Sequence, residues 1–302
     1  MCCAVLPYLM SPTIPYSASQ QDLFYPAKDL SNFPTVPPKS DAELCAWMCL
    51  LAYRDSYPAS FAFDQSTIAG KLTALGFQFV RFFESPERAK QGGTHCFLAI
   101  HDDSDPNKRL AVVAFRGTNK DDPTDLLDDV DAPLVDWKGQ SKVFDGWKDG
   151  LGEIQGPLLA AIKPINYKLV ITGHSLGAAM ATLLASLNTP TALYTIGSPR
   201  VGDASFVASL SAVASHRYVD CCDVVTELPP AVLGYAHVGS PLYIDRNRKV
   251  IASPADDYVS EDRLLARAEY LLKYAWKSGN IGVRDLADHA PNNYVTAIAA
   301  QT

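Results

Sequence analysis

The sequence has no surplus of positive charge and no long apolar run. Its 302 residues carry 26 Lys and Arg against 33 Asp and Glu, which gives a formal net charge of -7. Since nucleic acids and anionic bilayers attract positively charged surfaces, this balance argues against nucleic acid as a partner and against binding held by anionic membrane charge. No apolar stretch reaches the roughly 20 residues that span a bilayer, so we expect no transmembrane segment.

Signatures of disulfides, metals and cofactors are also missing. The seven cysteines are an odd number, with Cys45 and Cys49 one helical turn apart and Cys221 directly before Cys222. Neither spacing matches a disulfide framework or a zinc site, so we expect reduced and mostly buried thiols. No glycine-rich phosphate loop is present. We therefore expect neither a metal nor a cofactor.

The first 39 residues differ in composition from the rest of the chain. They are rich in proline and serine, which predicts an irregular N-terminal arm over residues 1–39. The first 17 residues lack a basic segment and are interrupted by Pro7, Pro12 and Pro15, so we expect no signal peptide. A cytoplasmic location follows as the expectation, with export by another route left open.

Residues 40–302 show no linker and no repeat. Their length and the overall content of 48% hydrophobic and 20% charged residues are typical of one large globular domain. Helical and strand-like runs alternate along them, which predicts an α/β fold with a mostly parallel central sheet and helices on both faces. We expect helices, each with a buried apolar face, at 40–52 and 261–277, others at 66–75, 147–162 and 204–213, and strands at 77–83, 94–101, 109–115, 168–172, 191–196 and 216–221.

The most informative stretch is 167–187, which reads YKLVITGHSLGAAMATLLASL. A β-branched run precedes residues 173–177, and apolar residues at helical spacing follow them. The sequence GHSLG at 173–177 matches G-x-S-x-G, the turn from strand to helix that exposes a nucleophilic serine above a sheet. Ser175 is therefore the candidate nucleophile.

A serine hydroxyl needs a base to take its proton, and the base needs an acid to orient it. Proteins with this serine turn carry the acid after the serine and the histidine after the acid. Three histidines follow Ser175 in the sequence. His216 opens a strand before any suitable acid, whereas His237 and His289 both satisfy the order, with His289 favoured.

The acid is expected where a strand after Ser175 ends. Asp223 follows the strand at 216–221 and is the preferred candidate. Asp220 lies within that strand and is expected to be structural, and Asp203, which follows the preceding strand, remains an alternative.

Five short motifs together resemble the class 3 lipase family, the fungal lipase-like branch of the α/β-hydrolases. They occur in the family's order across roughly residues 42–298: VAFRGT at 113–118, GHSLG at 173–177, GSPRVG at 197–202, DV and LP at 223–224 and 228–229, and DH at 288–289 with Tyr294. The resemblance implies an α/β-hydrolase fold with Ser175 as nucleophile, Asp223 as acid and His289 as base. It also implies an oxyanion hole formed by Thr118, through its amide and hydroxyl, and by the amide of Leu176.

Two segments are candidates for a cover over the site. Residues 119–135 mix six acids with apolar residues, which fits both a lid that opens at a lipid surface and a solvated acidic loop. The helix at 261–277 is the second candidate. We expect its apolar stripe to pack against the core rather than line an acyl channel; the stripe consists of Leu264, Leu265, Ala268, Leu271, Leu272 and Trp276.

These observations predict a serine hydrolase that cleaves carboxylic esters through an acyl-enzyme. The expected substrates are acylglycerols or other fatty acyl esters, with transient contact to a lipid interface. A phospholipase, an esterase of small or aromatic esters, and a lipase-like binding protein without catalysis are the alternatives.

Overall fold

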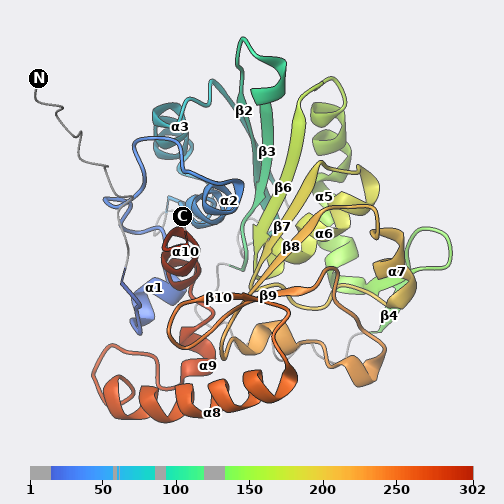
Figure 1. The fold of residues 1–302 in the computed structure, drawn as a ribbon. Helices are drawn as coiled ribbons and strands as arrows, with labels where there is room; N and C mark the ends of the chain where they lie inside the picture. Colours follow the sequence, from blue (N-terminus) through green and yellow to red (C-terminus); the bar gives the residue numbers. More distant parts are fainter. Residues whose placement is uncertain (1–14, 57–59, 61, 86–92, 119–132, 302) are drawn as a thin grey trace, which may run out of the picture.

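A computed structural model describes residues 15–56, 60, 62–85, 93–118 and 133–301 of the chain (Figure 1). The α-helices are α1 (Gln20–Phe24), α2 (Asp41–Leu51), α3 (Gln65–Ala74), α5 (Asp145–Ile162), α6 (Leu176–Leu187), α7 (Ala204–Ser209), α8 (Asp256–Lys273), α9 (Arg284–Ala287) and α10 (Pro291–Ala299). The strands are β1 (Phe79–Glu84), β2 (His95–His101), β3 (Leu110–Phe115), β4 (Leu134–Asp136), β5 (Lys142–Phe144), β6 (Lys168–His174), β7 (Ala192–Ile196), β8 (Ser215–Asp220), β9 (Pro241–Ile244) and β10 (Val250–Ala252). Short 3₁₀ turns occur at η2 (Pro106–Lys108), η4 (Val224–Glu227) and η5 (Ala231–Leu233). Within these ranges, no helix is both long and apolar enough to cross a membrane.

Eight strands form one central sheet in the order β1-β2-β3-β6-β7-β8-β9-β10. Neighbours from β3 to β9 are parallel, and the pairs at the two edges are antiparallel. The prediction of a mostly parallel sheet is confirmed. Phe115 of β3 pairs with Gly173 of β6, and His174 pairs with Ile196 of β7, so the carboxyl ends of these strands lie level. In such sheets this edge is where catalytic loops meet.

Helices cover both faces of the sheet, as predicted (Figure 1). Successive residues of β3 point to opposite faces, as a strand requires. Val112 packs into the cluster that holds Trp47 of α2, whereas Val113 packs into the cluster that holds Met180 of α6. A strand covered on both sides must be apolar throughout, which explains the uninterrupted run LAVVAF in β3.

Helix α2 is more deeply buried than the sequence predicts. Ser40 caps it, since the Ser40 hydroxyl accepts a hydrogen bond from the Glu43 amide at 3.2 Å. All residues from Glu43 to Leu51 are buried, not one face alone. The reason is that α2 lies between the sheet and α10, so the prediction of a single buried face is wrong.

Helix α8 departs from the prediction in the opposite sense. Its buried residues are Asp262, Ala266 and Tyr270. The predicted apolar stripe faces solvent, so its expected packing against the core is wrong; exposed members are Leu264 (68%), Leu265 (40%), Leu271 (60%), Leu272 (79%) and Trp276 (73%). On the inner side, Ala266 and Tyr270 pack into two small apolar clusters. The Asp262 carboxylate adds polar contacts, because it accepts hydrogen bonds from the Tyr243 hydroxyl and the Arg246 amide at 2.9 and 3.0 Å.

Candidate active site

The turn between β6 and α6 places Ser175 at the carboxyl edge of the sheet. Ser175 has a φ of 58° and a ψ of -131°, a conformation that is costly for a residue with a side chain. The flanking glycines allow it. A Cβ added to Gly173 would lie 2.1 Å from the Gly177 carbonyl oxygen, and one added to Gly177 would lie 2.6 Å from the Arg116 carbonyl oxygen. The spacing in GHSLG therefore follows from the close approach of backbone on both sides of the serine.

Three predicted residues come together at this turn. The Ser175 hydroxyl lies 2.8 Å from Nε2 of His289, and Nδ1 of His289 lies 2.9 Å from both carboxylate oxygens of Asp223. All three side chains are buried. Since an ionised carboxylate only accepts hydrogen bonds, Nδ1 of His289 is the donor and Nε2 is left to accept the serine proton.

The Asp223 carboxylate is fixed by two further donors. The Tyr294 hydroxyl donates to Oδ2 at 2.6 Å, and the Val225 amide donates to Oδ1 at 3.0 Å. Burial raises the pKa of Tyr294 well above its ordinary value, so this hydroxyl keeps its proton. Tyr294 belongs to one of the sequence motifs, but the sequence alone did not indicate its contact with the acid.

The alternative acids have other partners. Asp220 pairs with Arg248, whose Nη1 lies 2.7 and 2.8 Å from its two carboxylate oxygens. Asp203 caps α7 by accepting a hydrogen bond from the Phe206 amide at 2.8 Å. Both carboxylates therefore stabilise local structure elsewhere in the protein rather than at Ser175.

The other histidines after Ser175 are likewise engaged elsewhere. His216 stacks on Tyr194 with a ring separation of 4.4 Å. Nε2 of His237 donates to the Thr226 carbonyl at 2.8 Å. Burial, together with two nearby arginines, lowers the pKa of His237 to about 3, so this side chain is neutral.

Thr118 and Leu176 lie on the two segments that flank the serine. The Thr118 hydroxyl oxygen is buried and has no hydrogen-bond partner among the residues that the structure describes. The Leu176 amide is the first of α6, a position that has no acceptor within its own helix. A Cβ added to Gly117, directly before Thr118, would lie 3.0 Å from Cβ of Ser175. Unsatisfied donors beside a nucleophile are what an oxyanion hole requires.

A second chain of hydrogen bonds runs beneath the serine and was not foreseen from the sequence. The Gly117 amide donates to the Tyr53 hydroxyl, which lies 2.7 Å from Nδ1 of His174. Nε2 of His174 lies 2.9 Å from the carbonyl oxygen of His289. Burial lowers the pKa of His174 well below its ordinary value, so the ring is neutral. Because a carbonyl only accepts, Nε2 carries the proton and Nδ1 accepts from Tyr53. Tyr53 thereby connects the segment of Thr118 to the segment of His289.

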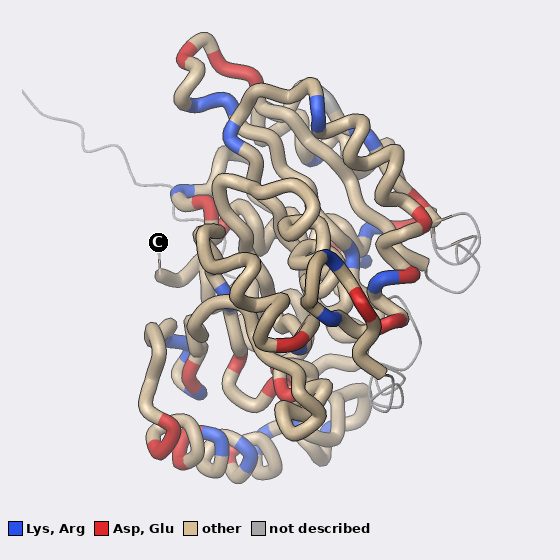
Figure 2. The backbone as a smooth tube through the Cα atoms, turned by 90° about the vertical axis from the view of Figure 1, so that its right-hand side faces the viewer, with Lys and Arg blue, Asp and Glu red and all other residues tan. Residues whose placement is uncertain are grey.

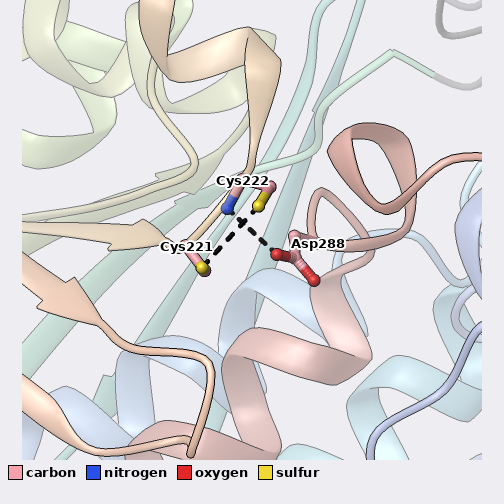
Figure 3. A group of neighbouring side chains, drawn as sticks. All are labelled: Cys221, Cys222 and Asp288. Atoms are coloured by element: carbon pink, nitrogen blue, oxygen red, sulfur yellow. Dashed lines mark hydrogen bonds between the residues drawn. The ribbon is translucent and has the colours of Figure 1, made fainter. Parts of the chain in front are cut away.

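A buried carboxylate also joins the segments of the acid and the base. Asp288 accepts hydrogen bonds from Arg284 at 3.0 Å, from the Tyr16 hydroxyl at 2.8 Å and from the Cys222 amide at 3.0 Å. One ligand atom each from Cys221, Cys222 and Asp288 lie within 4.8 Å of one another, a grouping that resembles a metal site (Figure 3). The carboxylate is already used by protein donors, so its visible role is structural.

The contact between Cys222 and Asp288 also positions the catalytic candidates. Cys222 directly precedes Asp223, and Asp288 directly precedes His289. The hydrogen bond between Cys222 and Asp288 therefore holds the acid and the base at a fixed separation. All five described cysteines are buried and free of disulfides.

The expected lid at 119–135 falls mainly on residues 119–132, which lie outside the described residues. Its last residues enter β4, which pairs with β5 in a small antiparallel sheet. The structure therefore leaves both interpretations of that loop as predictions.

Ser175 lies at a strained turn above a mostly parallel sheet, and its hydroxyl contacts a histidine that an aspartate orients. Serine hydrolases of the α/β-hydrolase class use this arrangement. The family model described as Lipase (class 3) matches residues 112–233, which include Thr118, Ser175 and Asp223. Over this segment the chain resembles the class 3 lipase family.

Similar curated proteins are lipases and phospholipases. The chain is 38% identical over 124 residues to a lipase of Rhizomucor miehei, covering 35% of this chain and 34% of that protein. It is 39% identical over 111 residues to secreted mono- and diacylglycerol lipase 1 of Fusarium solani (34% and 33%), and 30% identical over 193 residues to phospholipase A1-II 4 of Oryza sativa subsp. japonica (50% and 48%). The matches thus span about a third to a half of these relatives.

Solved structures of fungal lipases share the fold. The Rhizomucor miehei lipase propeptide complex superimposes with a TM-score of 0.52 at 26% identity, covering 67% of this chain and 66% of that chain. A fungal lipase-inhibitor complex superimposes with a TM-score of 0.54 at 26% identity, covering 71% and 82%. The prediction of an α/β-hydrolase fold is confirmed.

Proposed function

We propose that this protein hydrolyses carboxylic esters, with acylglycerols or other fatty acyl esters as substrates. The observation that carries the proposal is the unbroken set of contacts from Asp223 through His289 to Ser175, at 2.9 and 2.8 Å. The names of the fungal relatives support the choice of acyl esters.

The geometry gives each residue a role in two steps. The Ser175 oxygen attacks the ester carbonyl carbon while Nε2 of His289 takes the serine proton and Asp223 stabilises the charged imidazole. The carbonyl oxygen becomes negative and accepts hydrogen bonds from Thr118 and Leu176. The carbon-oxygen bond to the alcohol then breaks, and His289 gives the proton to the departing alcohol.

Water completes the reaction by the reverse use of the same groups. His289 takes a proton from water, whose oxygen attacks the acyl carbon, and the bond between Ser175 and the acyl group breaks. His289 returns the proton to the serine oxygen, and the carboxylic acid leaves. No metal or cofactor enters this scheme.

Turnover of nitrophenyl esters with short to long acyl chains tests the proposal. Replacing Ser175→Ala is expected to lower kcat by about a factor of 10⁶, since the members of a triad act as a unit. Wild-type protein that releases nitrophenol no faster than Ser175→Ala on every ester would sink the proposal and favour a binding protein without catalysis.

The rice relative favours one second candidate, cleavage of phospholipids. That match covers half of this chain, more than the fungal lipase matches do. Product analysis with phosphatidylcholine and trioleoylglycerol distinguishes the two: a higher kcat/KM on the phospholipid supports the second candidate. The cytoplasmic location stays a prediction, to be tested by cell fractionation.

A further inference from the structure

A short segment near the N-terminus packs against the region that carries His289. It consists of residues 16–20, and we call it the N-terminal segment. It pairs with the loop before α9, because the Ile281 amide donates to the Ala18 carbonyl at 2.8 Å. The helix that follows it, α1, lies beside α9 and α10 (Figure 1). The N-terminal segment is therefore fixed to the part of the chain that holds the candidate base.

Tyr16 of this segment binds the carboxylate that directly precedes the base. The Tyr16 hydroxyl donates to Oδ1 of Asp288 at 2.8 Å. The Cys222 amide donates to Oδ2 of Asp288 at 3.0 Å, a contact that Figure 3 shows. Burial raises the pKa of Tyr16 well above its ordinary value, so its hydroxyl keeps the proton that it donates. Tyr16 and Cys222 thus hold the two oxygens of one carboxylate, and Cys222 is the residue before Asp223.

Ser17 fixes the chain that follows the base. Asn293 lies in the first turn of α10, and its Nδ2 donates to the Ala287 carbonyl at 2.9 Å, which ties α10 to the end of α9 across His289. The Ser17 amide donates to Oδ1 of Asn293, and the Ser17 carbonyl accepts from Nδ2, both at 2.8 Å. The Asn293 side chain is fully buried. The N-terminal segment therefore binds side chains on both sides of His289.

The Tyr16 ring also covers two ion pairs beside the acid and the base. The guanidinium carbons of Arg248 and Arg284 lie 5.3 and 5.5 Å from the centre of this ring. Arg284 pairs with Asp288 at 3.0 Å. Arg248 pairs with Asp220 at 2.7 Å. Both carboxylates are fully buried, whereas Figure 2 shows many other charged residues along α8 and on outer loops. Since such pairs are strong only where water is excluded, the ring helps to keep the Asp288 carboxylate in place.

We propose that Tyr16 is a positioning residue for His289. It acts through Asp288, because its hydroxyl fixes the carboxylate that precedes the base and also binds the segment of the acid. His289 must present Nε2 to the serine proton and then to the departing alcohol, and a small displacement of such a group lowers the rate strongly. The proposal rests on the proposed function in one respect: the position of the base affects turnover only if Ser175 is acylated.

The test removes the Tyr16 hydroxyl and leaves the ring in place. The variant is Tyr16→Phe, and the matched control is Tyr270→Phe. Tyr270 packs in the same apolar cluster as Tyr16, and its hydroxyl donates to the Ile281 carbonyl at 2.7 Å. Each variant of the full-length protein thus loses one hydroxyl hydrogen bond from the same part of the molecule, and only Tyr16→Phe loses the bond to Asp288. Urea denaturation measures the stability of both.

On a short water-soluble nitrophenyl ester, we expect Tyr16→Phe to lower kcat by about tenfold and to leave KM within about twofold of wild type, because the base is displaced. Tyr270→Phe is expected to keep the wild-type kcat even where it lowers stability. The proton on Nδ1 of His289, which is bonded to Asp223, gives a low-field NMR resonance. We expect this resonance to shift in Tyr16→Phe and to stay in place in Tyr270→Phe.

A second variant, Ser17→Pro, removes the amide that donates to Asn293 and so detaches the segment on the other side of the base. It is expected to lower kcat at an unchanged KM, and it decides the matter if Tyr16→Phe does not fold.

Two results would overturn the positioning role. A wild-type kcat with an unmoved Nδ1 proton resonance in Tyr16→Phe would make the N-terminal segment structural only. An equal loss of kcat in Tyr270→Phe would assign the effect to packing of the cluster rather than to the bond with Asp288. Wild-type protein that hydrolyses no ester refutes the proposed hydrolysis instead, and the resonance of His289 then decides the positioning alone.

Discussion

Helices α2 and α8 carry leucines at the same kind of spacing, yet the protein uses them in opposite ways. Every residue of α2 from Glu43 to Leu51 is buried, whereas the leucines of α8 face water. Helix α10 covers α2 from outside, while α8 docks through Asp262 and Tyr270 and leaves its apolar face outward. Helical periodicity therefore identifies an apolar face and does not say what covers it.

Replacing a buried leucine of α2 by alanine is expected to have the largest effect on stability. Leu50 is 1% exposed within the α2 layer. Leu50→Ala is expected to lower the free energy of unfolding by about 2–5 kcal/mol, because it removes buried methyl groups and leaves a cavity. Urea denaturation measures this, and a loss below about 1 kcal/mol would remove the distinction between the two helices.

Tyr53, just beyond α2, tests whether that helix also serves the site. Tyr53→Phe leaves the Gly117 amide and Nδ1 of His174 without their partner, at a cost of about 1–3 kcal/mol for buried polar groups. We expect kcat on a soluble ester to fall while KM stays near the wild-type value, since the change acts on the position of Thr118 and His289. An unchanged kcat with lowered stability would make Tyr53 structural only.

Acid is expected to weaken the fold through two histidines that are held neutral: His174, which bonds Tyr53 just beyond α2, and His237, which bonds the Thr226 carbonyl. Burial lowers the pKa of His174 well below its ordinary value, and the pKa of His237 is about 3 for the same main reason. In the unfolded chain both take up a proton near pH 6.5, so the unfolded state binds more protons as the pH falls through that value.

For each such histidine the free energy of unfolding is expected to fall by up to about 1.4 kcal/mol per pH unit below about pH 6.5. For His237 the loss ends near its folded pKa of about 3. Urea unfolding at a series of pH values measures the slope. His237→Gln removes one of these groups and should flatten it; an unchanged slope would contradict the assignment.

The smallest effect is expected at Leu272 of α8. This side chain is 79% exposed, so Leu272→Ala should change the free energy of unfolding by no more than about 0.5 kcal/mol. The same urea assay that reports on Leu50→Ala applies. A loss as large as that of Leu50→Ala would mean that α8 is covered in solution.

The sequence predicted more about the elements of the fold than about the contacts within the site. The run LAVVAF in β3 indicates a strand covered on both faces, and Gly76 with a φ of 84° ends α3 as predicted. Some helix boundaries differ from the prediction: α8 begins at Asp256 rather than 261, and the acids Asp256 and Asp257 in its first turn favour the helix dipole. The expected helix at 204–213 ends at Ser209.

The partners of the serine required contacts between distant parts of the chain. The order of residues along the sequence left both His237 and His289 as candidate bases. Only the folded chain places Nε2 of His289 2.8 Å from the Ser175 hydroxyl. No sequence motif marks Tyr53. Its contact with His174 forms only when distant parts of the chain fold together, and such a contact leaves no regular spacing in the sequence.

The sequence by itself determined the local structure at GHSLG, since the glycines at 173 and 177 are required by backbone atoms that approach within 2.1 and 2.6 Å of an added Cβ. It also determined the apolar character of the central strands. Only the tertiary structure decided that the leucines of α8 face water and that Tyr53 reaches His174. Burial and long-range hydrogen bonds depend on which elements become neighbours, and periodicity along one element does not contain that information.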